Sequence, residues 1–125
     1  MASASVLIAE DDDNFRDAVE DALIEDGHSV VCTRNGADAL VALGKVRRPA
    51  LLLLDVHMPV MDGVTFLSHL QFHPLRDDFE VIIMSAVVNP ERLTHGPCVT
   101  RAMRKPFDVS EIQQLVWEFA ERRPA

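Results

Sequence analysis

The stretch Leu51-Leu52-Leu53-Leu54-Asp55 decides the fold, because four consecutive leucines predict a strand that is buried on both faces. The run stops abruptly at an acidic residue. Val6-Leu7-Ile8-Ala9 and Val81-Ile82-Ile83-Met84 repeat this pattern, the first ending at Glu10 and the second at Ser85. Strands that are buried on both faces are typical of parallel sheets covered by helices on each side.

Helical periodicity fills the segments between these strands. Apolar residues recur every three or four positions from Phe15 to Leu23, where Asn14 or Asp13 can cap the helix and Gly27 ends it. The other predicted elements are strands over 28–33 and 99–103 and helices over about 37–45, 64–70 and 109–119. Alternating strands and helices predict an α/β fold, a three-layer, doubly wound, five-stranded parallel sheet forming one domain over residues 1–125.

Charge and composition exclude several classes of partner. The 125 residues carry 20 acidic and 12 basic side chains, a formal net charge of −8, and nine of the acids but one base lie within residues 1–26. A chain without a basic surplus is a poor candidate for binding nucleic acid or a membrane surface. It also lacks a signal-peptide pattern and an apolar membrane span, so we expect a cytoplasmic protein.

The cysteines and most histidines show no metal-ligand spacing. Cys32 and Cys98 lie far apart without a CxxC motif, which favours buried free thiols over a disulfide. Four histidines are predicted to lie at the surface or in loops: His28, His69, His73 and His95.

Chemically capable side chains follow four of the predicted strands. Glu10 and Asp11 follow the first strand, Asp55 the third, Ser85 the fourth and Lys105 the fifth. Because the carboxyl ends of parallel strands meet at one edge of the sheet, we expect these groups to lie together. Three carboxylates, a hydroxyl and an ammonium suit a hard divalent cation beside a group that reacts with phosphate.

Four blocks resemble the signature blocks of response-regulator receiver domains, in order and across essentially the whole chain. They are Val6-Leu7-Ile8-Ala9-Glu10-Asp11-Asp12, Leu51 to Gly63 with its Asp55-Val56-His57-Met58-Pro59-Val60-Met61-Asp62-Gly63, Ile82-Ile83-Met84-Ser85-Ala86, and Arg104-Lys105-Pro106-Phe107. The resemblance implies strand order 2-1-3-4-5 and a stand-alone receiver of two-component signalling, similar to a chemotaxis regulator and without an output domain.

The resemblance also implies a phosphoacceptor and a metal site. Asp55 would accept a phosphoryl group from a sensor histidine kinase or a histidine phosphotransfer protein. Asp11 and Asp55 would hold Mg²⁺, with Mn²⁺ as an alternative ion, the backbone carbonyl of His57 as a further ligand and Glu10 acting through water. A partner downstream of the receiver is implied but not identified.

Three further groups would serve the transfer. Lys105 would pair with Asp55 and then with the phosphoryl oxygens, while Ser85 and the backbone N–H of Ala86 would donate hydrogen bonds to the phosphoryl group. The protein would catalyse only its own phosphotransfer and dephosphorylation, and so would not count as an enzyme. It would act by phosphorylation-controlled protein binding or as a relay or sink.

The sequence departs from the family pattern in its output region. Ala102 stands at the position of the switch aromatic, and the helix expected between Ser85 and Lys105 is short or degraded, with Pro90 and Pro97 inside it. A receiver-like binding module with phosphorylation-independent output is therefore an alternative. A Mg²⁺ phosphohydrolase is a third, disfavoured because His57 replaces the second aspartate that such enzymes use.

Overall fold

The sheet is parallel and five-stranded, with strand order β2-β1-β3-β4-β5, as predicted. A computed structural model describes residues 2–86 and 98–123 of the chain. The strands are β1 Ser5–Ala9, β2 Ser29–Thr33, β3 Ala50–Asp55, β4 Phe79–Ser85 and β5 Val99–Arg104. The helices are α1 Asp13–Glu25, α2 Gly36–Ala42, α3 Gly63–Leu70, the 3₁₀ turn Arg76–Asp78 and α4 Val109–Arg122.

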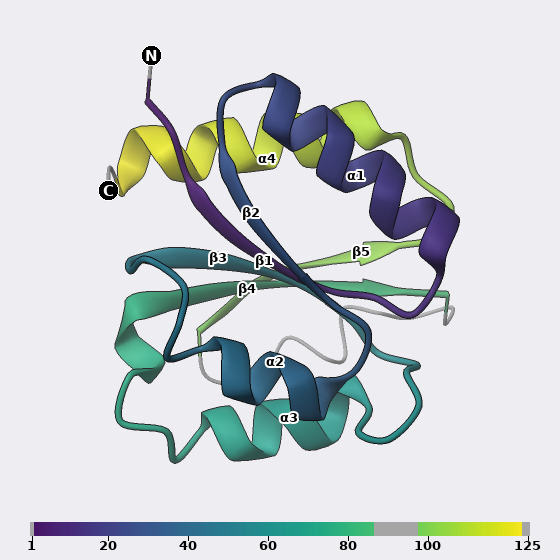
Figure 1. The fold of residues 1–125 in the computed structure, drawn as a ribbon, viewed down its shortest axis with the longest axis vertical. Helices are drawn as coiled ribbons and strands as arrows, with labels where there is room; N and C mark the ends of the chain where they lie inside the picture. Colours follow the sequence, from purple (N-terminus) through teal and green to yellow (C-terminus); the bar gives the residue numbers. More distant parts are fainter. Residues whose placement is uncertain (1, 87–97, 124–125) are drawn as a thin grey trace.

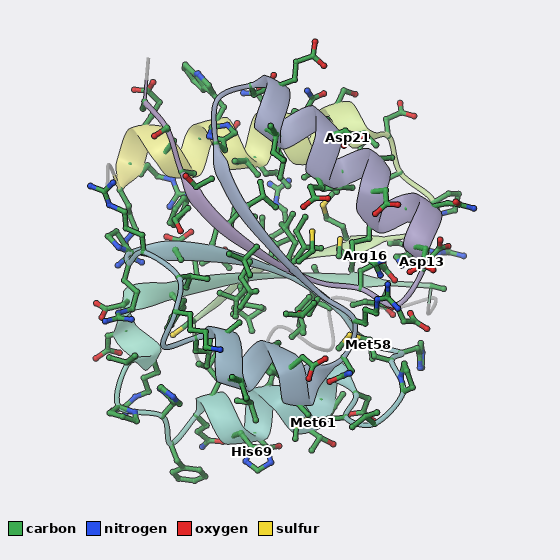
Figure 2. All side chains as sticks on the ribbon, viewed as in Figure 1. Asp13, Arg16, Asp21, Met58, Met61 and His69 are labelled. Atoms are coloured by element: carbon green, nitrogen blue, oxygen red, sulfur yellow. The ribbon has the colours of Figure 1, made fainter. Side chains whose placement is uncertain are left out.

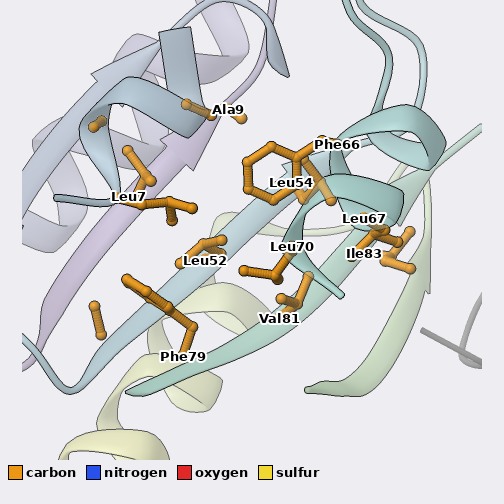
Figure 3. Close-up of a cluster of buried hydrophobic side chains, with 14 of the residues drawn as sticks. Leu7, Ala9, Leu52, Leu54, Phe66, Leu67, Leu70, Phe79, Val81 and Ile83 are labelled. Atoms are coloured by element: carbon orange, nitrogen blue, oxygen red, sulfur yellow. The ribbon is translucent and has the colours of Figure 1, made fainter. Parts of the chain in front are cut away.

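Helices cover both faces of the sheet. Figure 1 shows α1 and α4 on one side of the strands and α2 and α3 on the other. The leucines of β3 alternate between these sides: Leu52 and Leu54 pack with Phe66 under α2 and α3 (Figure 3), and Leu51 and Leu53 pack under α1 and α4. This two-sided burial explains why the strand contains no polar residue before Asp55.

Several helix boundaries differ from the sequence prediction. The residue that caps α1 is Asp12, whose Oδ1 accepts the N–H of Phe15, rather than Asn14 or Asp13. Helix α2 is capped by Asn35 and ends at Ala42, before the predicted end at Lys45, whereas α4 continues past Phe119 to Arg122. At the start of α1 several polar residues compete for the capping position, and the other differences lie at helix ends, which apolar periodicity does not define to the residue.

Two other expectations are wrong, and a third concerns residues that the structure does not describe. Cys32 and Cys98 are free but only half-buried, so their predicted full burial is wrong. The surface position predicted for His28 is also wrong, because this side chain is buried and its Nδ1 accepts the N–H of Ala4. The short helix expected between 86 and 98, with Pro90 and Pro97, lies outside the described residues.

No helix in the described part of the chain has the length and apolar character needed to cross a bilayer.

Gly63 sets the distance between the end of β3 and the start of α3. Its N–H donates to the carbonyl of Val56 at 2.8 Å. A Cβ at this position would lie 2.5 Å from the carbonyl oxygen of Asp55 and 3.0 Å from the Cα of Val56. Because both neighbours are main-chain atoms, neither can rotate away, and only glycine allows this close approach beside Asp55.

We expect Gly63→Ala to lower the free energy of unfolding by about 2 kcal/mol, since the added methyl must push the two segments apart. Urea unfolding measures the change. Gly44→Ala is the matched control, because a Cβ there meets no atom within 4 Å. Equal stability of the two variants would show that this contact does not constrain the site.

Candidate functional site

Three carboxylates converge at the carboxyl edge of the central strands. Glu10 and Asp11 follow β1, Asp55 ends β3, and one oxygen of each lies within 4.8 Å of the others. The parallel register, in which Ala9 pairs with Leu54, places the two strand ends side by side. Glu10 and Asp55 are buried whereas Asp11 is exposed, so the cluster opens to solvent on the side of Asp11.

An ammonium group stands against these carboxylates. The Nζ of Lys105 lies 2.5 Å from Oε1 of Glu10 and 3.6 Å from Oδ1 of Asp55. The backbone N–H of Lys105 donates to the carbonyl of Ser85 at 2.7 Å, which joins the end of β5 to the end of β4. The ring of Phe15 lies 4.8 Å from Nζ, where its π face adds a favourable cation–π contact.

The other predicted site residues lie at the same edge. Ser85 is the last residue of β4 and is fully buried, in a register that pairs Asp55 with the preceding Met84. Ala86 follows it and is exposed. The side chain of His57, two residues after Asp55, is also exposed. The fold thus brings every residue selected from the sequence to one end of the sheet.

Sequence reasoning missed Arg16, which supports the cluster from α1. Its side chain is 7% exposed, Nη1 donates to the carbonyl of Glu10 at 2.9 Å, and Nη2 lies 2.5 Å from Oδ1 of Asp13. The available signal was that Arg16 is the single base among the first 26 residues. A lone base within an acidic segment is a candidate for a buried partner.

Burial and crowding change the acidity of Asp55. Desolvation, followed by the charge of Glu10, raises the pKa of Asp55 from 3.8 to about 7, although Lys105 acts in the opposite direction. Two carboxylates at this spacing repel by about 3 kcal/mol at an effective dielectric of 20. A divalent cation would remove this repulsion, and oxygen ligands of this kind fit Mg²⁺.

Asp55→Asn should stabilise the protein at alkaline pH when no divalent cation is present. Because the folded-state pKa lies above that of the unfolded chain, stability falls as the pH rises from about 4 to about 7. The variant escapes this loss, so its advantage at pH 8 should reach roughly 1–3 kcal/mol and shrink near pH 4. Urea unfolding at the two pH values in EDTA measures it.

The control for this substitution is Asp21→Asn, which removes an exposed carboxylate from α1. We expect it to change stability by less than about 0.5 kcal/mol at either pH. An Asp55→Asn advantage of the same size at pH 4 and pH 8 would contradict the raised pKa.

Known proteins match this chain over most of its length. The sequence profile described as the response regulator receiver domain matches residues 6–116. The DNA-binding transcriptional regulator NtrC of Escherichia coli is 34% identical over 119 residues, which cover 93% of this chain and 24% of NtrC. Sporulation initiation phosphotransferase F of Bacillus subtilis is 28% identical over 121 residues, which cover 95% of both chains. The chain thus spans about a quarter of NtrC.

Solved structures share the fold. The receiver domain of a Francisella response regulator matches with a TM-score of 0.82 at 24% identity, over 98% of both chains. The receiver domain of a Pseudomonas aeruginosa sensor histidine kinase, which has a magnesium ion coordinated in its active site cleft, matches with a TM-score of 0.78 at 20% identity, over 96% of this chain and 98% of that one. Sequence profile and fold agree, and this chain belongs to the response regulator receiver domain family of two-component signalling.

Proposed function

We propose that Asp55 accepts a phosphoryl group from a phosphohistidine of a sensor histidine kinase or a histidine phosphotransfer protein, in a reaction that requires Mg²⁺. The observation that carries this proposal is the cluster of Glu10, Asp11 and Asp55 within 4.8 Å, with the ammonium of Lys105 3.6 Å from Asp55. Family membership supports it, because receiver domains take phosphoryl groups from such donors.

The metal ligands follow from which carboxylate oxygens already have protein partners. Oε1 of Glu10 pairs with Lys105, and Oε2 accepts the N–H of Asp12 at 3.2 Å. Glu10 is therefore assigned to the outer shell, where it acts through water. We assign direct ligation to Asp11 and Asp55, together with the backbone carbonyl of His57. This set leaves room for the waters that Mg²⁺ retains.

The transfer forms a bond between an oxygen of Asp55 and phosphorus as the bond from phosphorus to the donor imidazole nitrogen breaks. When bound, Mg²⁺ supplies charge neutralisation at the phosphoryl oxygens. Lys105 adds a second positive charge, while the hydroxyl of Ser85 and the N–H of Ala86 donate hydrogen bonds to those oxygens. Positioning and electrostatics thus carry the reaction, with little acid–base chemistry.

The phosphorylated chain is proposed to act as a relay, a sink or a phosphorylation-controlled binding module in the cytoplasm. The similarity to sporulation initiation phosphotransferase F, which is covered over 95% of its length, supports the role of a relay. A receiver domain is not a classical enzyme, because the phosphoryl group ends on its own side chain. The downstream partner is proposed to be a protein.

Phosphorylation-independent binding is the second candidate. Ala102 pairs with Ile83 between β5 and β4 and packs, half-buried, against the core. An alanine has no ring that can swing between an outward and an inward position. The movement by which an aromatic residue at this position would report phosphorylation is therefore absent at Ala102.

Acetyl phosphate with Mg²⁺ should add one phosphoryl group to the protein, detected by intact mass, and Asp55→Asn should abolish the addition. Mg²⁺ alone should raise the melting temperature by roughly 3–6 °C, because it binds only the folded chain. Asp11→Ala should remove most of this rise by deleting a direct ligand.

Asp17→Ala is the control for Asp11→Ala, since it removes an exposed acid of α1 away from the cluster. It should keep both the response to Mg²⁺ and the phosphorylation. A protein that gains no phosphoryl group and melts identically with and without Mg²⁺ would favour the second candidate.

A further inference from the structure

We infer that Arg16 is a positioning residue that sets the cation site before the cation binds, by fixing the main chain that carries Glu10 and Asp11. This inference rests on the function proposed above. Among the described residues, Arg16 is a buried cation near the cluster whose hydrogen bonds and ion pair involve none of the carboxylates of Glu10, Asp11 and Asp55. The inference assigns a role to this residue.

The guanidinium of Arg16 clamps the turn between β1 and α1 at both ends. Nη1 donates to the carbonyl of Glu10 at 2.9 Å, and Nη2 pairs with Oδ1 of Asp13 at 2.5 Å. Figure 2 shows Arg16 and Asp13 together at the first turn of α1, with Asp21 farther along the helix. The backbone N–H of Arg16 also donates to the carbonyl of Asp12 at 2.9 Å, so the turn is held from inside the helix.

The turn needs this support because of the charges it carries. Glu10 is 1% exposed, so water scarcely reaches its carbonyl. If Arg16 were removed, this carbonyl would be left buried without the hydrogen bond that Arg16 donates. Without a cation, the mutual repulsion of the carboxylates of Glu10, Asp11 and Asp55 acts to separate them. A turn free to relax would carry Asp11 away from Asp55.

Arg16 and Lys105 act on different atoms of the same residue. Lys105 holds the carboxylate of Glu10. Arg16 holds the carbonyl of Glu10, and so it constrains the main chain without occupying an oxygen that serves the cation or its waters. Groups that support metal ligands in this indirect way commonly change metal affinity 10- to 100-fold when they are removed.

Positioning and simple electrostatics predict opposite results for Arg16. A positive charge beside the cluster repels Mg²⁺, so the loss of that charge alone should tighten Mg²⁺ binding. If Arg16 positions the turn, its replacement should weaken Mg²⁺ binding instead. Arg34 is a natural comparison, because it is exposed and lies near the same turn. The pKa of Asp13 is lowered first by Arg16 and to a smaller extent by the charge of Arg34.

Isothermal titration of the full chain with MgCl₂ tests the inference. Arg16→Met, which keeps an unbranched apolar stem, should weaken Mg²⁺ binding by about 10-fold. Arg34→Met should leave the affinity unchanged or improve it. Arg16→Lys retains the charge but cannot donate from two guanidinium nitrogens at once. Its Mg²⁺ affinity should lie between those of the parent and Arg16→Met.

Phosphorylation by acetyl phosphate separates positioning from a general loss of structure. The rate for Arg16→Met should approach that of the parent at saturating Mg²⁺, because Asp55 and Lys105 are intact. Circular dichroism confirms that each variant is folded at the temperature used. If Arg16→Met is not folded, Arg16→Lys is tested instead, and its Mg²⁺ affinity should be about threefold weaker than that of the parent.

A folded Arg16→Met or Arg16→Lys that binds Mg²⁺ as tightly as the parent, or more tightly, would overturn the positioning role and leave the proposed function standing. A parent protein that binds no Mg²⁺ would overturn both. Asp13→Ala removes the weaker, exposed contact of the guanidinium and leaves its hydrogen bond to the carbonyl of Glu10. Its Mg²⁺ affinity should therefore stay within about twofold of that of the parent.

Discussion

The constraint on which the structure depends is the repulsion among carboxylates held together at one end of the sheet. Glu10 and Asp55 are buried side by side, and burial, followed by the charge of Glu10, raises the pKa of Asp55 to about 7. Lys105 offsets part of the charge through its contacts with both side chains. A divalent cation, alone or together with a phosphoryl group, would neutralise the remaining repulsion. The same crowding therefore destabilises the folded chain in the absence of a cation and favours the binding of one.

The hydrophobic core holds these carboxylates in place against their repulsion. The leucines of β3 face both layers of helices, so Asp55 stands at the end of a strand that is anchored on two sides. The absence of a side chain at Gly63 lets α3 approach the carbonyl of Asp55, and the buried guanidinium of Arg16 secures the turn after β1. Rigid attachment keeps the charges together where a looser chain would let them separate.

Most of the fold could be predicted from the sequence. Unbroken apolar runs that end at polar residues identified the central strands, and helical periodicity identified the helices between them. Helix ends were less predictable, because Asp12, Asp13 and Asn14 are all competent caps and only the geometry of the turn selects Asp12. The burial of His28 was also missed, since it depends on a contact with Ala4 that is distant in sequence.

The sequence by itself determined which side chains stand at the carboxyl edge of the sheet, because strand ends in a parallel sheet must meet at one edge and the polar residues there are few. Only the tertiary structure decided how their charges interact. Lys105 pairs more closely with Glu10 than with Asp55, and Arg16 turns inward to the carbonyl of Glu10. Both contacts depend on distances between separate elements of the fold. Electrostatic energies depend on those distances and on burial, and neither is contained in the order of the residues.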